Sequence, residues 1–106
     1  MIDFYRQILE QTGYKPKTTF WQDFSIAEWY GEKEIRYTYK RAFEEWKTNI
    51  EYLTELVLIL NWKIWQLYPI KEDIAKIYNE LWEEADKYCL DNLTGEDLKY
   101  FLRTTD

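Results

Sequence analysis

Residues 53–68, LTELVLILNWKIWQLY, decide what kind of fold this chain adopts. Eleven of these sixteen positions are apolar or aromatic, so most of the stretch must be covered. A membrane-spanning helix needs about 20 mainly apolar residues. Here Glu55 and Lys63 bracket only seven positions, Asn61 lies among them, and each charge costs about 2.5–3.5 kcal/mol at the centre of a membrane helix. We therefore expect protein, and not lipid, to bury this stretch.

The composition predicts one small folded domain over residues 1–106. Aromatic residues make up 20% of the chain, whereas disordered chains are poor in them. Cys89 is the single cysteine, so no intramolecular disulfide can form. The first residues, MIDFYR, lack the basic and apolar regions of a secretory signal, and we expect a cytoplasmic protein.

The first third of the chain reads as a helix, an extended segment and a second helix. Ile2, Tyr5, Ile8 and Leu9 share one face of a helix predicted over about 2–12, which Gly13 would end. Pro16 and its Thr neighbours favour an extended or turning segment. SIAE at residues 25–28 has the spacing of a capping box, which predicts a short helix that ends near residue 31.

The longest apolar pattern covers residues 33–67 in steps of three and four. We interpret it as one long or kinked central helix, because neither Gly nor Pro interrupts it. TNIE at residues 48–51 is a second capping-box spacing, and it leaves open a division into two helices. The apolar positions are Ile35, Tyr39, Ala42, Phe43, Trp46, Ile50, Leu53, Val57, Leu60, Ile64 and Leu67.

An amphipathic C-terminal helix is predicted over about 71–92, after the stop at Tyr68-Pro69. TGED at residues 94–97 would open a short terminal helix with Leu98, Phe101 and Leu102. The inner stripe of the 71–92 helix comprises Ile70, Ile74, Ile77, Tyr78, Leu81, Trp82, Ala85, Tyr88 and Cys89. Because no segment alternates with period two, we predict an all-α fold, a compact bundle of three to five helices.

A second apolar stripe on the 53–68 segment, formed by Leu58, Trp62 and Trp65, needs a cover of its own. The aromatic segment with Phe20, Trp21, Phe24, Trp29 and Tyr30 can supply it from within the chain. A second copy of the protein can supply it from outside. We favour the intramolecular cover, because a small domain needs these aromatics for its core.

The residue types present argue against an enzyme. The chain has no His, which removes Ser-His-Asp catalysis, and one Cys without His leaves no ordinary zinc set. Gly-rich phosphate loops are also missing from the sequence. Cys89 falls on an inner helix stripe, where a small buried hydrophobe is expected. We predict no catalytic residues, no metal and no cofactor.

Charge is concentrated in the last third of the chain. Residues 71–97 carry three basic and nine acidic residues, a net charge of −6 that equals that of the whole protein. Lys33, Arg36, Lys40 and Lys47 lie toward one side of the preceding helical segment. This pattern is typical of neighbouring helices with complementary charges and a solvated acidic face. The alternative is an acidic docking face for a basic partner.

Three stretches, TGYKPKTTFWQDFSIAEWYG, YLTELVLILNWKIW and YNELWEEADKYCLDNLTGEDLKYFLRTTD, together resemble small proteins of gut bacteria and their phages or mobile elements. That group has no assigned activity, so the resemblance carries over no functional residues. It covers most of the chain, and it implies a bacterial cytoplasmic setting with an accessory or anti-host-defence role.

We therefore expect a non-enzymatic protein–protein interaction module, an accessory protein of a mobile element or phage. The alternative is an acidic mimic of nucleic acid that inhibits a DNA-binding host defence protein. A protein partner, a basic one if the acidic face is used, or a second copy is expected; direct nucleic-acid binding is not, because the net charge is negative. The candidate contact residues are Tyr37, Tyr52, Leu58, Trp62, Trp65, Glu80, Glu83, Glu84 and Asp86.

Overall fold

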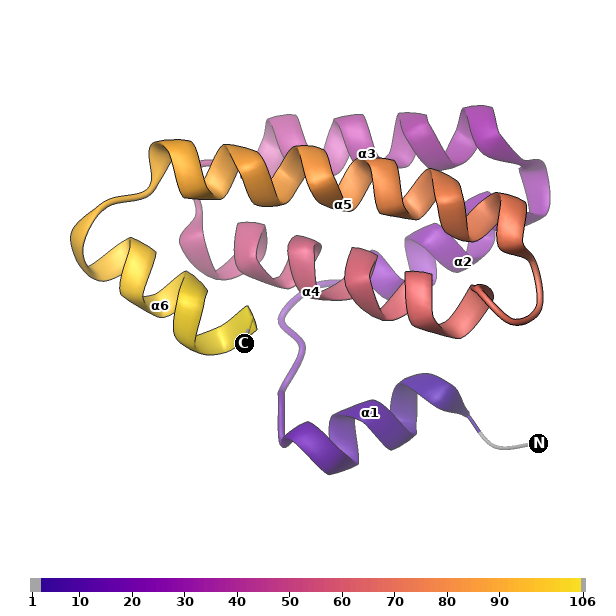
Figure 1. Ribbon diagram of the computed structural model, residues 1–106, viewed down its shortest axis with the longest axis horizontal. Coiled ribbons are helices and arrows are strands. Elements are labelled where there is room, and N and C mark those ends of the chain that lie inside the picture. Colours follow the sequence, from indigo (N-terminus) through magenta and orange to yellow (C-terminus); the bar gives the residue numbers. More distant parts are fainter. Residues whose placement is uncertain (1–2, 106) are drawn as a thin grey trace.

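Six helices follow one another along residues 3–105, the part of the chain that the computed structural model describes (Figure 1). No strand occurs in this part, so the all-α prediction is confirmed. The number of helices exceeds the expected three to five by one, because residues 33–67 belong to two helices. The helices are α1 (Phe4–Thr12), α2 (Phe20–Tyr30), α3 (Glu32–Trp46), α4 (Ile50–Leu67), α5 (Glu72–Asn92) and α6 (Gly95–Thr105).

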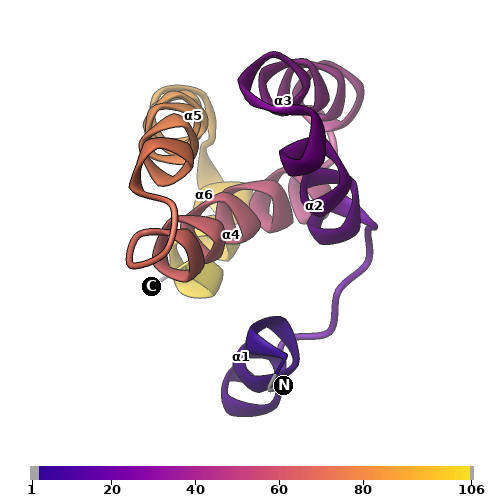
Figure 2. The same cartoon turned by 90° about the vertical axis from the view of Figure 1, so that its right-hand side faces the viewer.

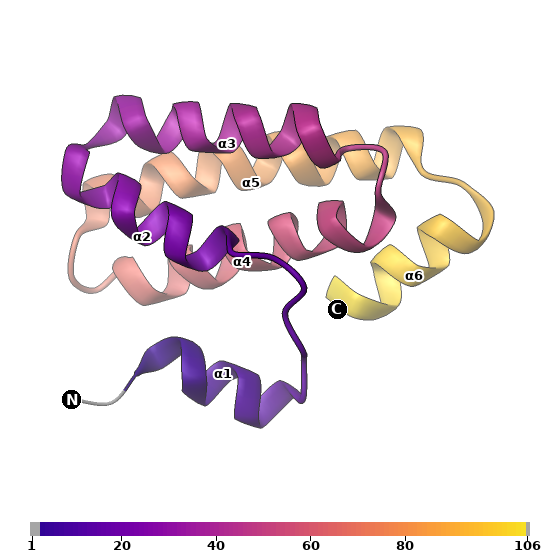
Figure 3. The same cartoon turned by 180° about the vertical axis from the view of Figure 1, so that it is seen from behind.

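The predicted single long central helix is wrong, because the chain turns back between α3 and α4 (Figure 3). Asn49 causes the break. Its backbone is extended, and its side-chain oxygen accepts the N–H groups of Glu51 at 3.1 Å and Tyr52 at 3.2 Å. Asn49 is therefore a helix N-cap. It accepts backbone N–H groups in the first turn of α4, which have no carbonyl partner within that helix because the helix begins there.

Most of the other predicted boundaries are confirmed. Gly13 and Gly31 end α1 and α2 with positive φ angles of 71° and 105°. Ile2, which the first helix was expected to include, lies outside the described residues. The capping box at Ser25 is wrong, since α2 begins at Phe20 and the Ser25 hydroxyl donates within the helix to the Trp21 carbonyl at 2.8 Å.

Helix α4 forms the centre of the bundle, between α5 and α6 on one side and α2 on the other (Figures 1 and 2). All eight residues from 53 to 60 are buried. Phe20, Trp21 and Phe24 are buried in the core, but they do not cover the second stripe as predicted. The rings that meet Trp62 are those of Tyr5 and Tyr14, and Trp65 stays exposed. Trp29 and Tyr30, expected to contribute, are instead exposed. Ile70, expected on the inner stripe of α5, is exposed in the turn before it.

Helix α1 lies beneath α2 and α4, at the end of an extended arm formed by residues 13–19 (Figures 2 and 3). Its inward residue is Tyr5, whose ring stacks on Trp21 with centroids 4.3 Å apart and meets Trp62 at 6.2 Å. A few aromatic contacts therefore hold α1 to the bundle. Among residues 3–105, no helix combines the length and the apolar character that crossing a bilayer requires.

Candidate interaction surface

Glu55, in the first half of α4, is a buried carboxylate that holds the arm against the bundle. None of its surface is exposed. One oxygen accepts the Tyr14 hydroxyl at 2.8 Å and the Lys17 N–H at 2.7 Å. The other accepts the Thr18 N–H at 2.9 Å and the Thr18 hydroxyl. Burial, together with the hydrogen bond to Glu55, raises the pKa of Tyr14. Both oxygens are fully used, so this carboxylate is a structural anchor.

Lys63, two turns further along α4, anchors the second half of α2. Its side chain is 1% exposed, and its ammonium lies 2.9 Å from the Glu28 carboxylate and 2.7 Å from the Ser25 hydroxyl. It also lies 4.1 Å from the centroid of the Trp21 ring. Tyr78 of α5 donates to the same Glu28 oxygen at 2.6 Å. Burial lowers the pKa of Lys63, and Glu28 opposes that shift.

Sequence reasoning missed both anchors, because it treated charged residues as solvent-facing. The signal that could have found them is the position of Glu55 and Lys63 within the apolar 53–68 run, since a charge buried there must be paired. Lys63 and Cys89 are both buried, and burial raises the pKa of the Cys89 thiol to about 12. Within residues 3–105, no three Asp, Glu or Cys side chains gather closely enough to hold a metal ion.

The predicted aromatic and apolar contact residues separate into two groups. Leu58 is buried, and Trp62 is half-buried against Tyr5 and Tyr14, with ring centroids 6.2 and 6.0 Å apart. Tyr52 is likewise half-buried and packs on the Trp46 ring at 4.4 Å. Only Tyr37 and Trp65 among the five are exposed, by 54% and 69%, and they lie on different helices.

The predicted acidic residues lie along α5, where part of their charge is already paired. Glu80 binds Arg36 of α3 at 2.6 Å, and Glu83 accepts the Asn79 side-chain amide at 3.1 Å. Glu84 is exposed, whereas Asp86 is half-buried and burial raises its pKa. Of the four basic residues expected to complement this face, Arg36 is the one that forms an ion pair with α5 within residues 3–105.

A different apolar surface emerges on α2 and α3, which we call the hairpin surface: Ile26, Trp29, Tyr30 and Tyr37. All four side chains are more than half exposed, and Trp29 reaches 89%. The first three share one side of α2 by their spacing, opposite to the buried Phe24. Their helical spacing, which places them opposite to Phe24, is a signal in the sequence that could have identified these exposed residues. The end of α4 and the turn that follows it carry a smaller set, the turn surface: Trp65, Tyr68 and Ile70.

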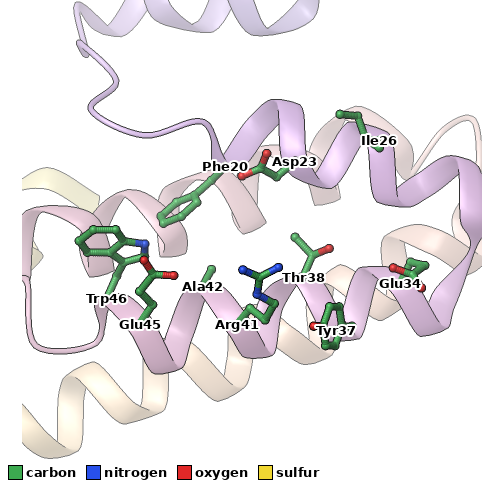
Figure 4. A pocket seen from close by; sticks show the side chains of 10 residues that line it. All are labelled: Phe20, Asp23, Ile26, Glu34, Tyr37, Thr38, Arg41, Ala42, Glu45 and Trp46. Atoms are coloured by element: carbon green, nitrogen blue, oxygen red, sulfur yellow. The ribbon is translucent and has the colours of Figure 1, made fainter.

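A groove of about 450 Å³ runs between α2 and α3 beside the hairpin surface (Figure 4). Ile26 lies on its α2 side and Tyr37 and Arg41 on its α3 side. The exposed side chains of Ile26 and Tyr37 therefore border a concave surface, whereas Trp29 and Tyr30 lie outside the lining. The remaining lining residues are Phe20, Asp23, Glu34, Thr38, Ala42, Glu45 and Trp46.

No protein-family model, curated protein or solved structure matches this chain. A proposal for its function therefore depends on the exposed side chains, the groove and their charges.

Proposed function

We propose that the protein is a non-enzymatic protein-binding module whose contact surface is the hairpin surface. The observation that carries this proposal is the exposure of four large apolar side chains on one helical hairpin beside a groove. Burying an exposed aromatic side chain contributes roughly 1.5–3 kcal/mol, and Trp and Tyr dominate interface hot spots. Trp29 is the most exposed of them, so burial in the core does not explain its presence.

The positions of the reactive side chains support the non-enzymatic part of the proposal. The Lys63 ammonium is buried and paired with Glu28 and Ser25, and Cys89 is buried in the core. A nucleophile must be accessible and activated, and these two are neither. The resemblance to proteins of gut bacteria and their mobile elements supports an accessory role in such a host.

Affinity capture with matched variants tests the proposal. The hairpin variant carries Ile26→Ala, Trp29→Ala and Tyr37→Ala, and the control turn variant carries Ile70→Ala, Trp65→Ala and Tyr68→Ala. Each removes one Ile, one Trp and one Tyr that are more than half exposed. The tagged proteins are incubated with nuclease-treated lysate of a gut bacterium, at low and high salt.

We expect wild type and the turn variant to retain the same stoichiometric protein and the hairpin variant to lose it. Equal retention by all three proteins would contradict the proposal. If only the turn variant lost the captured protein, the contact surface would be the turn surface and not the hairpin surface. Retention of nothing but an untagged copy of the chain would indicate self-association in place of a partner.

A second candidate is the acidic mimic of nucleic acid, which the exposed carboxylates of α5 favour. The seven carboxylates of α5 over about 31 Å of helix give one per about 4.5 Å, against one charge per about 1.7 Å in duplex DNA. The pairing of Glu80 with Arg36 reduces this density further. Salt-sensitive competition with DNA for the captured protein would support mimicry, and competition unchanged by Glu83→Gln and Glu84→Gln would exclude it.

A further inference from the structure

We infer that the groove between α2 and α3 receives one face of a basic amphipathic helix from a partner protein. This inference rests on the proposed function and names the partner chemistry for the same surface.

The shape of the groove suits a helix. Its lining residues on α3 extend from Glu34 to Trp46, a distance of about 18 Å, or just over three helical turns. Thr38 and Ala42 lie between Tyr37 and Trp46 along this lining and are small, so a third helix can approach closely (Figure 4). Ile26 and Tyr37 stand on opposite sides, where they can contact the flanks of such a helix.

The charges of the groove favour a positively charged partner. Asp23, Glu34 and Glu45 line it, and none of the three has a Lys or Arg nitrogen within 4 Å among residues 3–105. The one cation in the lining is Arg41, whose guanidinium lies 5.8 Å from the Tyr37 ring centroid. Three carboxylates against one guanidinium favour Lys and Arg on the partner and repel phosphate or acidic peptides.

The apolar part of the lining excludes a purely ionic ligand. The exposed Ile26 and the half-buried Trp46 line the same groove as the three carboxylates, and the buried Phe20 and Ala42 form its floor. A partner that satisfies both parts must alternate apolar residues with basic ones at helical spacing. That pattern is an amphipathic helix that places residues i, i+3, i+4 and i+7 in the groove. An extended peptide has no sheet edge here with which to pair, since residues 3–105 contain no strand.

Peptide selection tests the inference directly. A display library of random 16-residue peptides is selected on the immobilised wild-type protein, with counter-selection on the hairpin variant. We expect the recovered sequences to be rich in Lys and Arg, with apolar residues three or four apart, and to become helical when bound by circular dichroism. Their affinity should fall at least tenfold for the protein with Glu34→Gln and Glu45→Gln, and little for the protein with Glu83→Gln and Glu84→Gln.

Two results would overturn the inference. Peptides that bind the wild type but not the hairpin variant, and that are neutral or acidic, would refute a basic helical partner. They would not contradict the proposed function. A selection that yields no hairpin-dependent peptide would refute a linear helical partner. The lysate capture does not depend on the library, so it decides the proposed function separately.

Discussion

The two tryptophans of α2 occupy opposite situations on one helix. Trp21 is buried, stacks on Tyr5 at 4.3 Å and lies beneath the Lys63 ammonium at 4.1 Å. Trp29, two turns later, is 89% exposed. One side of α2 is therefore fixed to α4, α1 and the arm, while the other side presents aromatic surface to solvent. The difference teaches that the aromatic side chains of α2 occupy two environments, the core and the solvent, which substitutions on α2 can separate.

The inner side of α2 is held at both ends by charges from α4. Glu55 binds the chain just before α2, at Lys17 and Thr18, and Lys63 binds the second half through Glu28. A carboxylate near the start of a helix and an ammonium toward its end both match the helix dipole. These anchors fix the position of α2 along α4, and the outer side is thereby presented in a defined orientation.

The largest expected effect is that of truncating the inner tryptophan. We expect Trp21→Ala to lower the free energy of unfolding by about 3–5 kcal/mol, because it leaves a cavity and removes the rings beside Tyr5 and Lys63. Trp29→Ala, its control on the same helix, should stay within about 0.5 kcal/mol of wild type. Urea unfolding followed by far-ultraviolet circular dichroism measures both. Equal losses would mean that the two sides of α2 do not differ as described.

The next effect separates two carboxylates one turn apart on α4 that contact the same arm residue. Glu55 accepts the Lys17 N–H and is buried, whereas Glu51 pairs with the exposed Lys17 ammonium at 3.3 Å. We expect Glu55→Ala to cost about 3 kcal/mol, because it leaves buried donors unsatisfied. Glu51→Ala should cost less than about 1 kcal/mol, as for surface pairs. A small loss for both in chemical denaturation would remove Glu55 as the anchor of the arm.

A smaller effect is expected for the buried lysine. Lys63→Met should lower the free energy of unfolding by about 2 kcal/mol. This loss is smaller than for breaking a fully buried ion pair, because Glu28 keeps the hydrogen bond from Tyr78 and some contact with water. The control is Lys76→Met, since Lys76 is exposed and pairs with Glu72 at 3.7 Å within one helix. Thermal and urea unfolding of both variants give the comparison. An unchanged stability of Lys63→Met would show that the ion pair contributes nothing net.

Alkaline pH should also weaken the inner contacts. Burial raises the pKa of Tyr5 and Cys89 to about 12 and raises those of Tyr14, Tyr39 and Tyr78 as well. In the unfolded chain these groups lose protons near pH 8.5–10, so the folded state binds more protons and stability falls as pH rises further.

Lys63 acts in the opposite direction, since its lowered pKa gives stability that rises with pH up to about 10.5. The five acidic groups outnumber it, and we expect the urea midpoint to fall between pH 9 and 12. Tyr78→Phe should make that fall shallower than in wild type. A midpoint that rises over the whole range would contradict the burial of these groups.

Much of the fold could be predicted from the sequence, because amphipathic spacing and stop residues act locally. Gly13, Gly31 and Pro69 marked helix ends correctly. The break at Asn49 was an open alternative, from the TNIE spacing at residues 48–51, but it was not preferred, since the apolar phase continues across it and the cap depends on a single side chain. Glu55 and Lys63 could not be placed, because the groups that bind them lie 35 to 41 residues away in the sequence.

The candidate surface was predictable only in part. Of the five aromatic and apolar candidates, Tyr37 and Trp65 are exposed, while Leu58, Trp62 and Tyr52 pack inside or against the bundle. The groove was not foreseen, because it forms where α2 and α3 lie side by side, and no local pattern encodes that packing.

The measurement that tests the central claim most directly determines stability and binding on the same preparation of the hairpin variant. The account predicts a free energy of unfolding within about 1.5 kcal/mol of wild type, the sum of three small surface effects, together with loss of the captured partner that the turn variant retains. A variant that keeps the partner, or one that unfolds as Trp21→Ala is expected to, would contradict the claim that the outer side of α2 and α3 exists for binding.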